Sequence, residues 1–139
     1  MAAIVKADFL ARFLAAAGRT PFVWGSFDCC LWLADWVVVW HGVDPAHWLR
    51  GRYDDEASAA ALIEPYGGIA GIVGRCARDA GLREKAGEET AGDVGVVPIP
   101  TLAGQIKPVG ALCTGARWAL LTQSGLVSIR VDPITVWGL

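Results

Sequence analysis

The sequence predicts one α+β domain spanning residues 1–139, in which helices come first and pack on an antiparallel sheet or partial barrel that follows. Apolar residues recur at helical spacing over about residues 1–82, whereas residues 93–139 form short apolar runs separated by glycines and polar turns. Helices and strands segregated along a chain indicate α+β rather than alternating α/β architecture. With 139 residues, 54% of them hydrophobic, the chain can bury a real core.

Composition argues against two classes of partner. The formal net charge is -2 and the basic residues are scattered, which argues against nucleic-acid binding. The longest apolar run, residues 29–40, is shorter than the roughly 20 residues that a membrane span needs, and Asp35 interrupts it. Residues 9–17 resemble a signal segment only faintly, because Asp8 and Arg12 break the pattern and the spacing is helical. We therefore expect no membrane insertion.

The cysteines and histidines do not form a familiar metal or disulfide pattern. No C-x-x-C motif occurs and no export signal is visible, so reduced thiols are expected at the four cysteines, Cys29, Cys30, Cys76 and Cys113. His41 and His47 are not spaced with the cysteines as zinc ligands are. We expect neither a metal nor a cofactor.

The first two helices carry the clearest local signals. Residues 8–17 predict an amphipathic helix that Gly18 ends. A second helix is predicted from about Asp28 to His41, with Gly42 at its C-terminal cap. This second helix is apolar on nearly every face. We therefore expect it to be the most buried element, packed against the strands that follow Asp93.

The later elements follow from shorter patterns. We expect helices over residues 44–49, 56–64 and 69–80, a turn over residues 65–68, and a surface loop over residues 83–92. Strands are expected over residues 93–98, 109–114, 117–121 and 126–130, and an edge strand over residues 134–137.

Cys29 is the candidate nucleophile because it lies at a predicted helix start. Free amides and the positive end of the helix dipole favour a thiolate there. The alternative is that Cys29 is a small buried apolar residue, as free cysteines often are. Asp28 is expected to cap the helix or bind amides of the Trp24 turn. Asp35, on the same side of the helix, should pair with Arg50 or Arg52.

The chain also resembles a known family through several motifs. A W-G-x-x-D-C turn opens the buried helix, G-D-V begins the strand region, and V-G-A-L-C-T-G follows. This order resembles the NlpC-type cell-wall cysteine peptidases of the papain-like superfamily over residues 24–126. Together with G-V-D-P, R-G-R-Y and T-G-A-R-W-A, it is similar to a short family of phages, prophages and gene-transfer-agent-like clusters.

This resemblance implies a papain-like fold with Cys29 as nucleophile and a polar third position at Thr122 or Gln123. The family histidine would precede V-G, where this chain has Pro108. His41 cannot replace it, because twelve helical residues separate it from Cys29 by about 18 Å, and a base must lie within about 3 Å. His47 follows the far end of the same helix.

Two functions are consistent with these expectations. The first is a degenerate NlpC-type protein of a phage or prophage tail tip or hub, with a mainly structural or assembly role and other tail proteins as partners. The alternative is an active cysteine peptidase that cleaves peptidoglycan stem peptides during genome delivery. The resemblance implies a location in the virion, or in the bacterial cytoplasm before assembly.

Overall fold

The computed structural model describes residues 2–139, with side chains from Val5 onward. The N-terminal part is helical, with α1 (Ala2–Ala17), α2 (Cys29–His41), α3 (Glu56–Ile63), the 3₁₀ turn η1 (Glu64–Tyr66) and α4 (Gly68–Asp79). The remainder forms β1 (Arg83–Lys85), β2 (Val94–Pro100), β3 (Ile106–Cys113), β4 (Trp118–Thr122), β5 (Gly125–Ile129) and β6 (Thr135–Gly138). The predicted α+β class and the segregation of helices from strands are confirmed.

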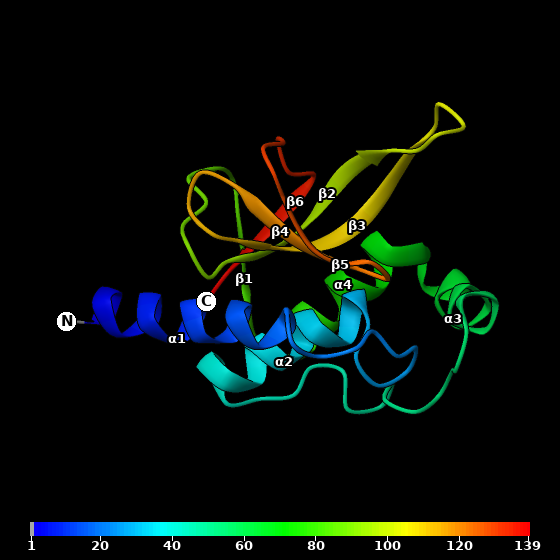
Figure 1. Ribbon diagram of the computed structural model, residues 1–139, viewed down its shortest axis with the longest axis horizontal. Coiled ribbons are helices and arrows are strands. Elements are labelled where there is room, and N and C mark those ends of the chain that lie inside the picture. The colour runs from blue at the N-terminus through cyan, green and yellow to red at the C-terminus, as the bar shows by residue number, and fades with distance from the viewer. Residues whose placement is uncertain (1) are drawn as a thin grey trace.

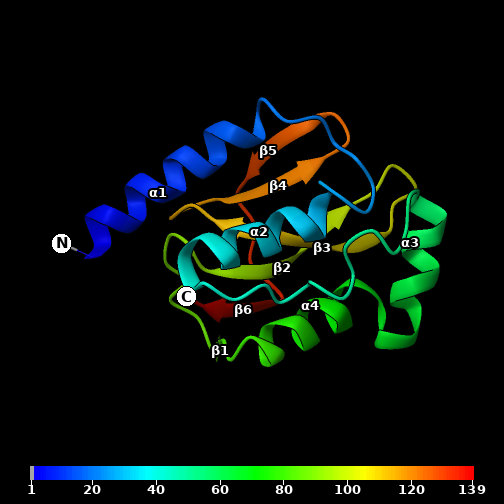
Figure 2. The same ribbon diagram turned by 90° about the horizontal axis from the view of Figure 1, so that it is seen from below.

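The six strands form one antiparallel sheet in the order β1-β6-β2-β3-β4-β5. Figure 1 shows the helices below this sheet and both termini at the same side of the molecule. Seen from the helical side, α2 crosses the middle of the sheet, with α1 on one flank and α4 on the other (Figure 2).

Helix α2 is the central buried element, as the sequence predicts. Leu31 and Trp36 have no exposed surface, and Val37 is 3% exposed. Asp28 caps its N-terminus, and Gly42 ends it in the left-handed conformation with φ of 81°. One side of α2 packs with α1 and the sheet, and Leu31 and Ala34 on another side pack with the 46–53 turns, α3 and α4, which explains why the helix is hydrophobic on several faces.

Helix α1 is longer than predicted, because it begins at Ala2 rather than Asp8. Residues 2–7 contain no glycine or proline that would stop a helix from extending. Phe13 anchors α1 on α2: its ring centroid lies 5.6 Å from that of Trp32 and 5.5 Å from that of Trp36. These aromatic contacts hold α1 against the central helix.

A third, smaller core lies on the opposite face of the sheet from α2. Its buried members are Val97, Ala111, Cys113, Trp118, Leu120 and Val136. The Trp118 ring reaches across to Gly95, where a Cβ atom would lie 2.9 Å from the ring. Gly95 is therefore needed for this packing, and both faces of the central strands are covered.

Three predictions about individual segments are wrong. Residues 44–49 form turns instead of a short helix, because Asp44 accepts the Ala46 amide and Gly51 then donates to the Gly25 carbonyl, which redirects the chain. The 83–92 loop contains strand β1, which is paired with β6. Strand β6 is not an edge, because it lies between β1 and β2.

The β2–β3 hairpin extends beyond its neighbours as a two-stranded arm (Figure 1). Pro98 and Pro108 lie opposite each other in this arm. The Cys113 amide donates to the Asp93 carbonyl, so alternate residues of β3 face β2, and Pro108 faces the outer edge. The prolines thus leave the ladder intact and remove outward donors. Near the tip, Leu102 is fully exposed and Ile106 is 65% exposed.

The described residues include no single helix with the length and apolar character of a bilayer span. Only α3 with η1 and α4 taken together reach that length and composition, and they are bent by 66° at their junction.

Candidate functional site

The start of α2 is organised by the buried carboxylate of Asp28, which is 1% exposed. Oδ1 accepts the amides of Cys30 at 3.2 Å and Leu31 at 3.0 Å, which is the capping role expected from the sequence. Oδ2 accepts the Gly25 amide at 2.9 Å, so the same side chain also holds the preceding turn. Asp28 is therefore fully used in fixing the backbone around Cys29.

Tyr53 completes this arrangement and is a residue that the sequence reasoning missed. Its hydroxyl donates to Asp28 Oδ2 at 2.6 Å. Burial, followed by this bond, raises the pKa of Tyr53 far above its ordinary value, so the hydroxyl stays protonated. Gly25 has φ of 82°, and a Cβ there would lie 1.9 Å from the Tyr53 carbonyl oxygen. The W-G and R-G-R-Y motifs are thus two halves of one contact.

Asp35 lies one heptad after Asp28 and pairs with Arg50 at 2.8 Å, as one of the two expected pairings. Arg50 also binds Asp44 at 2.9 Å and so joins α2 to the 44–50 turns. Burial raises the pKa of Asp35, while the bond to Arg50 lowers the pKa of Asp44. Arg52 does not take part, because it donates to the Trp48 carbonyl.

An open cavity of about 300 Å³ lies beside Cys29, between the start of α2, α3, the beginning of β3 and the end of β4. It exists because β3 and β4 pair only at Leu112 with Ala119 and Cys113 with Trp118, and separate beyond these pairs. Its wall brings together the side chains on which the chemistry depends, namely Cys29, Glu56, Lys107, Pro108, Thr122 and Gln123.

A second open cavity of about 340 Å³ continues from the first. The two share Phe22, Leu121, Thr122 and Gln123, and the second extends to Arg19 after the end of α1. Together they form a groove, which we call the Cys29 groove.

Cys29 has a lower pKa than an ordinary cysteine. The main cause is the Cys30 thiol, which donates a hydrogen bond to the Cys29 sulfur, and the Lys107 ammonium adds a smaller effect in the same direction. Burial and the Asp28 charge oppose this lowering of the pKa. The pKa of Cys30 is raised instead, first by this hydrogen bond and then by burial. Cys29 is therefore the cysteine of the pair that ionises more readily.

The structure describes no imidazole or carboxylate hydrogen-bonded to the Cys29 sulfur. His41 is at the other end of α2, where its Nε2 lies 3.0 Å from the Ala80 carbonyl oxygen. His47 lies beside the Asp44 carbonyl oxygen at 3.4 Å. Both positions agree with the expectation that neither histidine can reach Cys29.

The position expected for the family histidine does lie on the cavity wall, but it holds Pro108. Its neighbour Lys107 also lines the cavity and places a positive charge near Cys29, as an imidazolium would. Lysine is an ammonium at neutral pH and cannot accept a proton from the thiol. The site can therefore stabilise a thiolate, and the one carboxylate on its wall, Glu56 in the first turn of α3, is not among the groups that interact with the Cys29 thiol.

Thr122 and Gln123 also line the cavity. The Thr122 hydroxyl donates to the Gly125 carbonyl at 2.8 Å and accepts the Ser124 amide at 3.2 Å. It therefore serves the β4–β5 turn. The exposed Gln123 side chain is left to face the groove, although there is no imidazole for it to orient.

The second acidic motif residue is structural too. Asp93, in the G-D-V motif, is 1% exposed. Its carboxylate accepts hydrogen bonds from Lys85 Nζ at 2.7 Å and from the Thr90 amide at 2.8 Å. It also accepts the Leu139 amide at 3.4 Å, which ties the C-terminus to the start of β2. The described residues contain no cluster of three or more side chains that could hold a metal ion.

A family model described as a domain of unknown function, DUF6950, matches residues 6–138. No curated protein and no solved structure matches the chain. The matched range includes the Cys29 groove, the Asp28 arrangement and all six strands. The chain belongs to the DUF6950 family.

Proposed function

We propose that this chain is a component of a phage or prophage tail tip or hub, with a degenerate NlpC-type, papain-like fold and a mainly structural or assembly role. The observation that carries the non-hydrolytic part is the wall of the Cys29 groove, where Pro108 stands at the histidine position and no base is bonded to the thiol. The tail location rests on the resemblance of the W-G-x-x-D-C, R-G-R-Y and T-G-A-R-W-A motifs.

Chemistry at Cys29 supports this assignment. A cysteine peptidase needs a thiolate and also a proton donor for the leaving amine, and such acid–base help is worth about 10²- to 10⁴-fold in rate. The groove favours the thiolate through Cys30 and Lys107 but offers no imidazole to deliver the proton. Binding without turnover is the behaviour expected of this arrangement.

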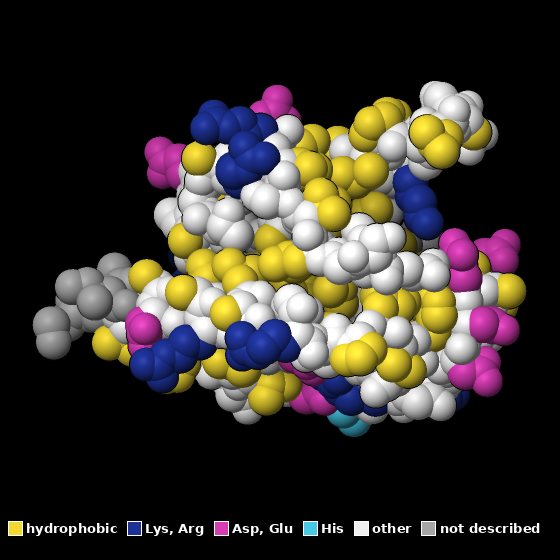
Figure 3. Space-filling view, viewed as in Figure 1, with side chains coloured by type: hydrophobic (Ala, Val, Ile, Leu, Met, Phe, Trp, Pro, Cys, Tyr) yellow, Lys and Arg dark blue, Asp and Glu magenta, His cyan; other side chains and the backbone are white. Residues whose placement is uncertain are grey.

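The molecular surface supports a role in protein contacts. Apolar side chains gather on the projecting end of the β2–β3 arm in Figure 3, where Leu102 and Ile106 are exposed. Exposed apolar patches mark contacts with other proteins, and Leu102 is the most exposed large hydrophobic side chain among the described residues. We assign this tip to the contact with a neighbouring tail protein.

The alternative is an active cysteine peptidase that cleaves peptidoglycan stem peptides. It is favoured by the lowered pKa of Cys29 and by the open groove beside it. It requires a base that is not bonded to Cys29 in this structure, such as a side chain of a neighbouring subunit. In that case peptidoglycan would be the ligand of the groove.

A complementation experiment separates the two functions. Particles that lack the gene for this chain are supplied with the wild-type protein, Cys29→Ala, Leu102→Asp or the matched exposed control Ser124→Asp. The structural proposal predicts normal particle yield and infectivity for Cys29→Ala and Ser124→Asp, and loss of particle assembly for Leu102→Asp.

Particles that contain Cys29→Ala, assemble in normal number and fail to infect would contradict the proposal in favour of the peptidase. Normal assembly with Leu102→Asp would remove the arm tip from the contact. Circular dichroism of each purified variant shows whether it folds, and so identifies failures that come from misfolding. Binding of the folded variants to purified tail proteins then tests the contact itself.

A further inference from the structure

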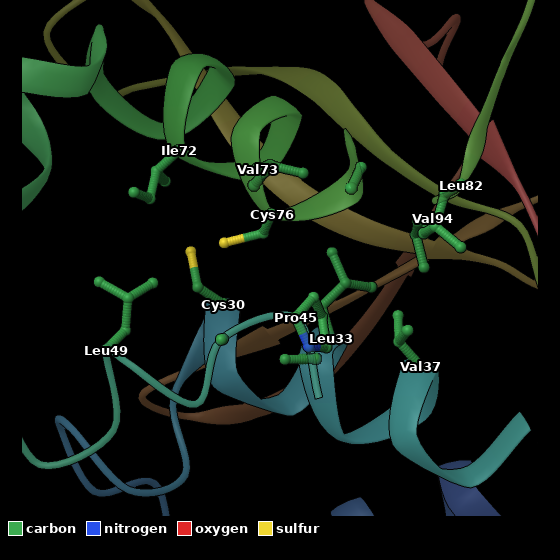
Figure 4. Close-up of a pocket in the computed structure, with 13 residues that line it drawn as sticks. Cys30, Leu33, Val37, Pro45, Leu49, Ile72, Val73, Cys76, Leu82 and Val94 are labelled. Carbon is green, nitrogen blue, oxygen red and sulfur yellow. The ribbon is translucent and has the colours of Figure 1, made fainter. Parts of the chain in front are cut away.

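Cys30 does not line the Cys29 groove but a small cavity between α2 and α4. This cavity has a volume of about 40 Å³, and apart from Cys30 and Cys76 its wall is apolar. Cys30 comes from the first turn of α2 and Cys76 from the middle of α4. In Figure 4 the two sulfur atoms point toward one another across the cavity.

The two thiols face each other in this cavity, while Cys30 also interacts with the neighbouring Cys29 thiol. Burial raises the pKa of Cys76 to about 11. The bond to Cys29, followed by burial, raises the pKa of Cys30, and the nearby Cys76 also contributes. Both are thus neutral thiols at neutral pH, on a wall that is otherwise apolar.

We infer that Cys30 and Cys76 are a site of oxidative modification, at which a low-molecular-weight disulfide such as glutathione disulfide forms an intramolecular disulfide that joins α2 to α4. The geometry that carries this is the approach of the two side chains from facing helices into one cavity. The other two cysteines are arranged differently, since Cys29 opens to the groove and Cys113 lies in the core on the opposite face of the sheet.

The exchange proceeds in two balanced steps. One protein thiolate attacks a sulfur of glutathione disulfide, whose S–S bond breaks as a glutathione thiolate leaves. The second protein thiol then loses its proton to solvent, and its sulfur attacks the protein sulfur of the mixed disulfide, which releases the second glutathione. Two protein thiols are oxidised and one glutathione disulfide is reduced to two glutathiones. Because only thiolates react, the raised pKa values make the reaction slow at pH 7 and faster toward pH 9.

The disulfide would fix the part of the chain that frames the Cys29 groove. The loop between Cys30 and Cys76 contains Tyr53, which holds Asp28, and α3, which forms one wall of the groove. Cytosolic thiols stay reduced, whereas disulfides persist outside cells. If the proposed tail location holds, the bond forms after release from the host and stiffens the assembled protein. The exchange chemistry itself does not depend on that location.

The test uses the purified full chain, equilibrated at pH 8.5 with glutathione disulfide and alkylated after acid quench. Trypsin releases Cys76 in the peptide of residues 76–78, and Cys29 with Cys30 in the peptide of residues 20–50. We expect a cross-link between these peptides in the wild type and in Cys29→Ala, and none in Cys30→Ala or Cys76→Ala. The Tm should rise by roughly 5–15 °C on oxidation and fall again with dithiothreitol, because the bond closes a long loop.

Three results would overturn the inference. These are four alkylatable thiols after equilibration, glutathione adducts without a cross-link, and a cross-link that persists in Cys30→Ala and so belongs to Cys29. Peptide mapping of the wild-type protein alone tests the first two results, so they do not depend on the folding of any variant. Cys113 should stay free throughout and serves as the internal control.

Discussion

The substitution Asp28→Ala gives the sharpest stability prediction, because one buried carboxylate accepts four hydrogen bonds around Cys29. Removal of the N-cap bonds alone costs about 1 kcal/mol. The substitution also leaves the Gly25 amide and the Tyr53 hydroxyl without their charged acceptor, and hydrogen bonds to charged groups are worth about 1.5–3 kcal/mol each. We expect the free energy of unfolding to fall by about 4–7 kcal/mol.

Urea denaturation followed by tryptophan fluorescence measures this loss, and two variants serve as controls. Tyr53→Phe removes one of the four bonds and should cost about 1.5–3 kcal/mol. Asp55→Ala removes an exposed N-cap, that of α3, and should cost clearly less than Asp28→Ala. A loss for Asp28→Ala no larger than that for Asp55→Ala would refute the reasoning that Asp28 organises the site.

Three further predictions concern the thiol, the core and the surface charges. Lys107→Met should raise the pKa of Cys29 and slow its alkylation by iodoacetamide at pH 7 roughly two- to tenfold, whereas Lys107→Arg should stay close to wild type. Equal alkylation rates for all three proteins would exclude Lys107 as the charge partner of Cys29. Val37→Asp should unfold the protein or cost several kcal/mol, whereas Val38→Asp, at a position 41% exposed, should be tolerated in the same urea titration. The lowered pKa of Asp44 adds stability at pH values above the unfolded pKa, and this stability is lost as the pH falls through the lower folded pKa. Asp44→Asn should therefore flatten the dependence of the free energy of unfolding on pH below about pH 4. An unchanged slope in acid would refute this.

The sequence predicts the parts of the fold that depend on local signals. Helix α2 has a capping aspartate, a terminal glycine and an apolar run between them, and its bounds and burial follow from these alone. Asp35 pairs with Arg50 because the 44–50 turns return directly alongside α2. The cavity also brings together Cys29, Pro108, Thr122 and Gln123, the positions to which the family resemblance points.

The sequence does not predict features that depend on distant contacts. Strand β1 has only three residues, two of them exposed, and exists because β6 pairs with it from the other end of the chain. The role of Tyr53 depends on Asp28, which lies 25 residues earlier. Lys107 has no motif of its own, and only the separation of β3 from β4 brings it to the groove. The R-G-R-Y block was the one local signal that could have pointed to Tyr53.

Hydrolysis of bacterial stem peptides by the purified chain is the most direct measurement of the central claim that Cys29 lacks a proton-transferring partner. Product release should be followed by mass spectrometry for wild type, Cys29→Ala and Pro108→His, the last of which restores an imidazole on the cavity wall. We predict that wild type and Cys29→Ala are equally inactive and that any gain is confined to Pro108→His. Robust turnover by the wild-type protein that disappears in Cys29→Ala would contradict the account.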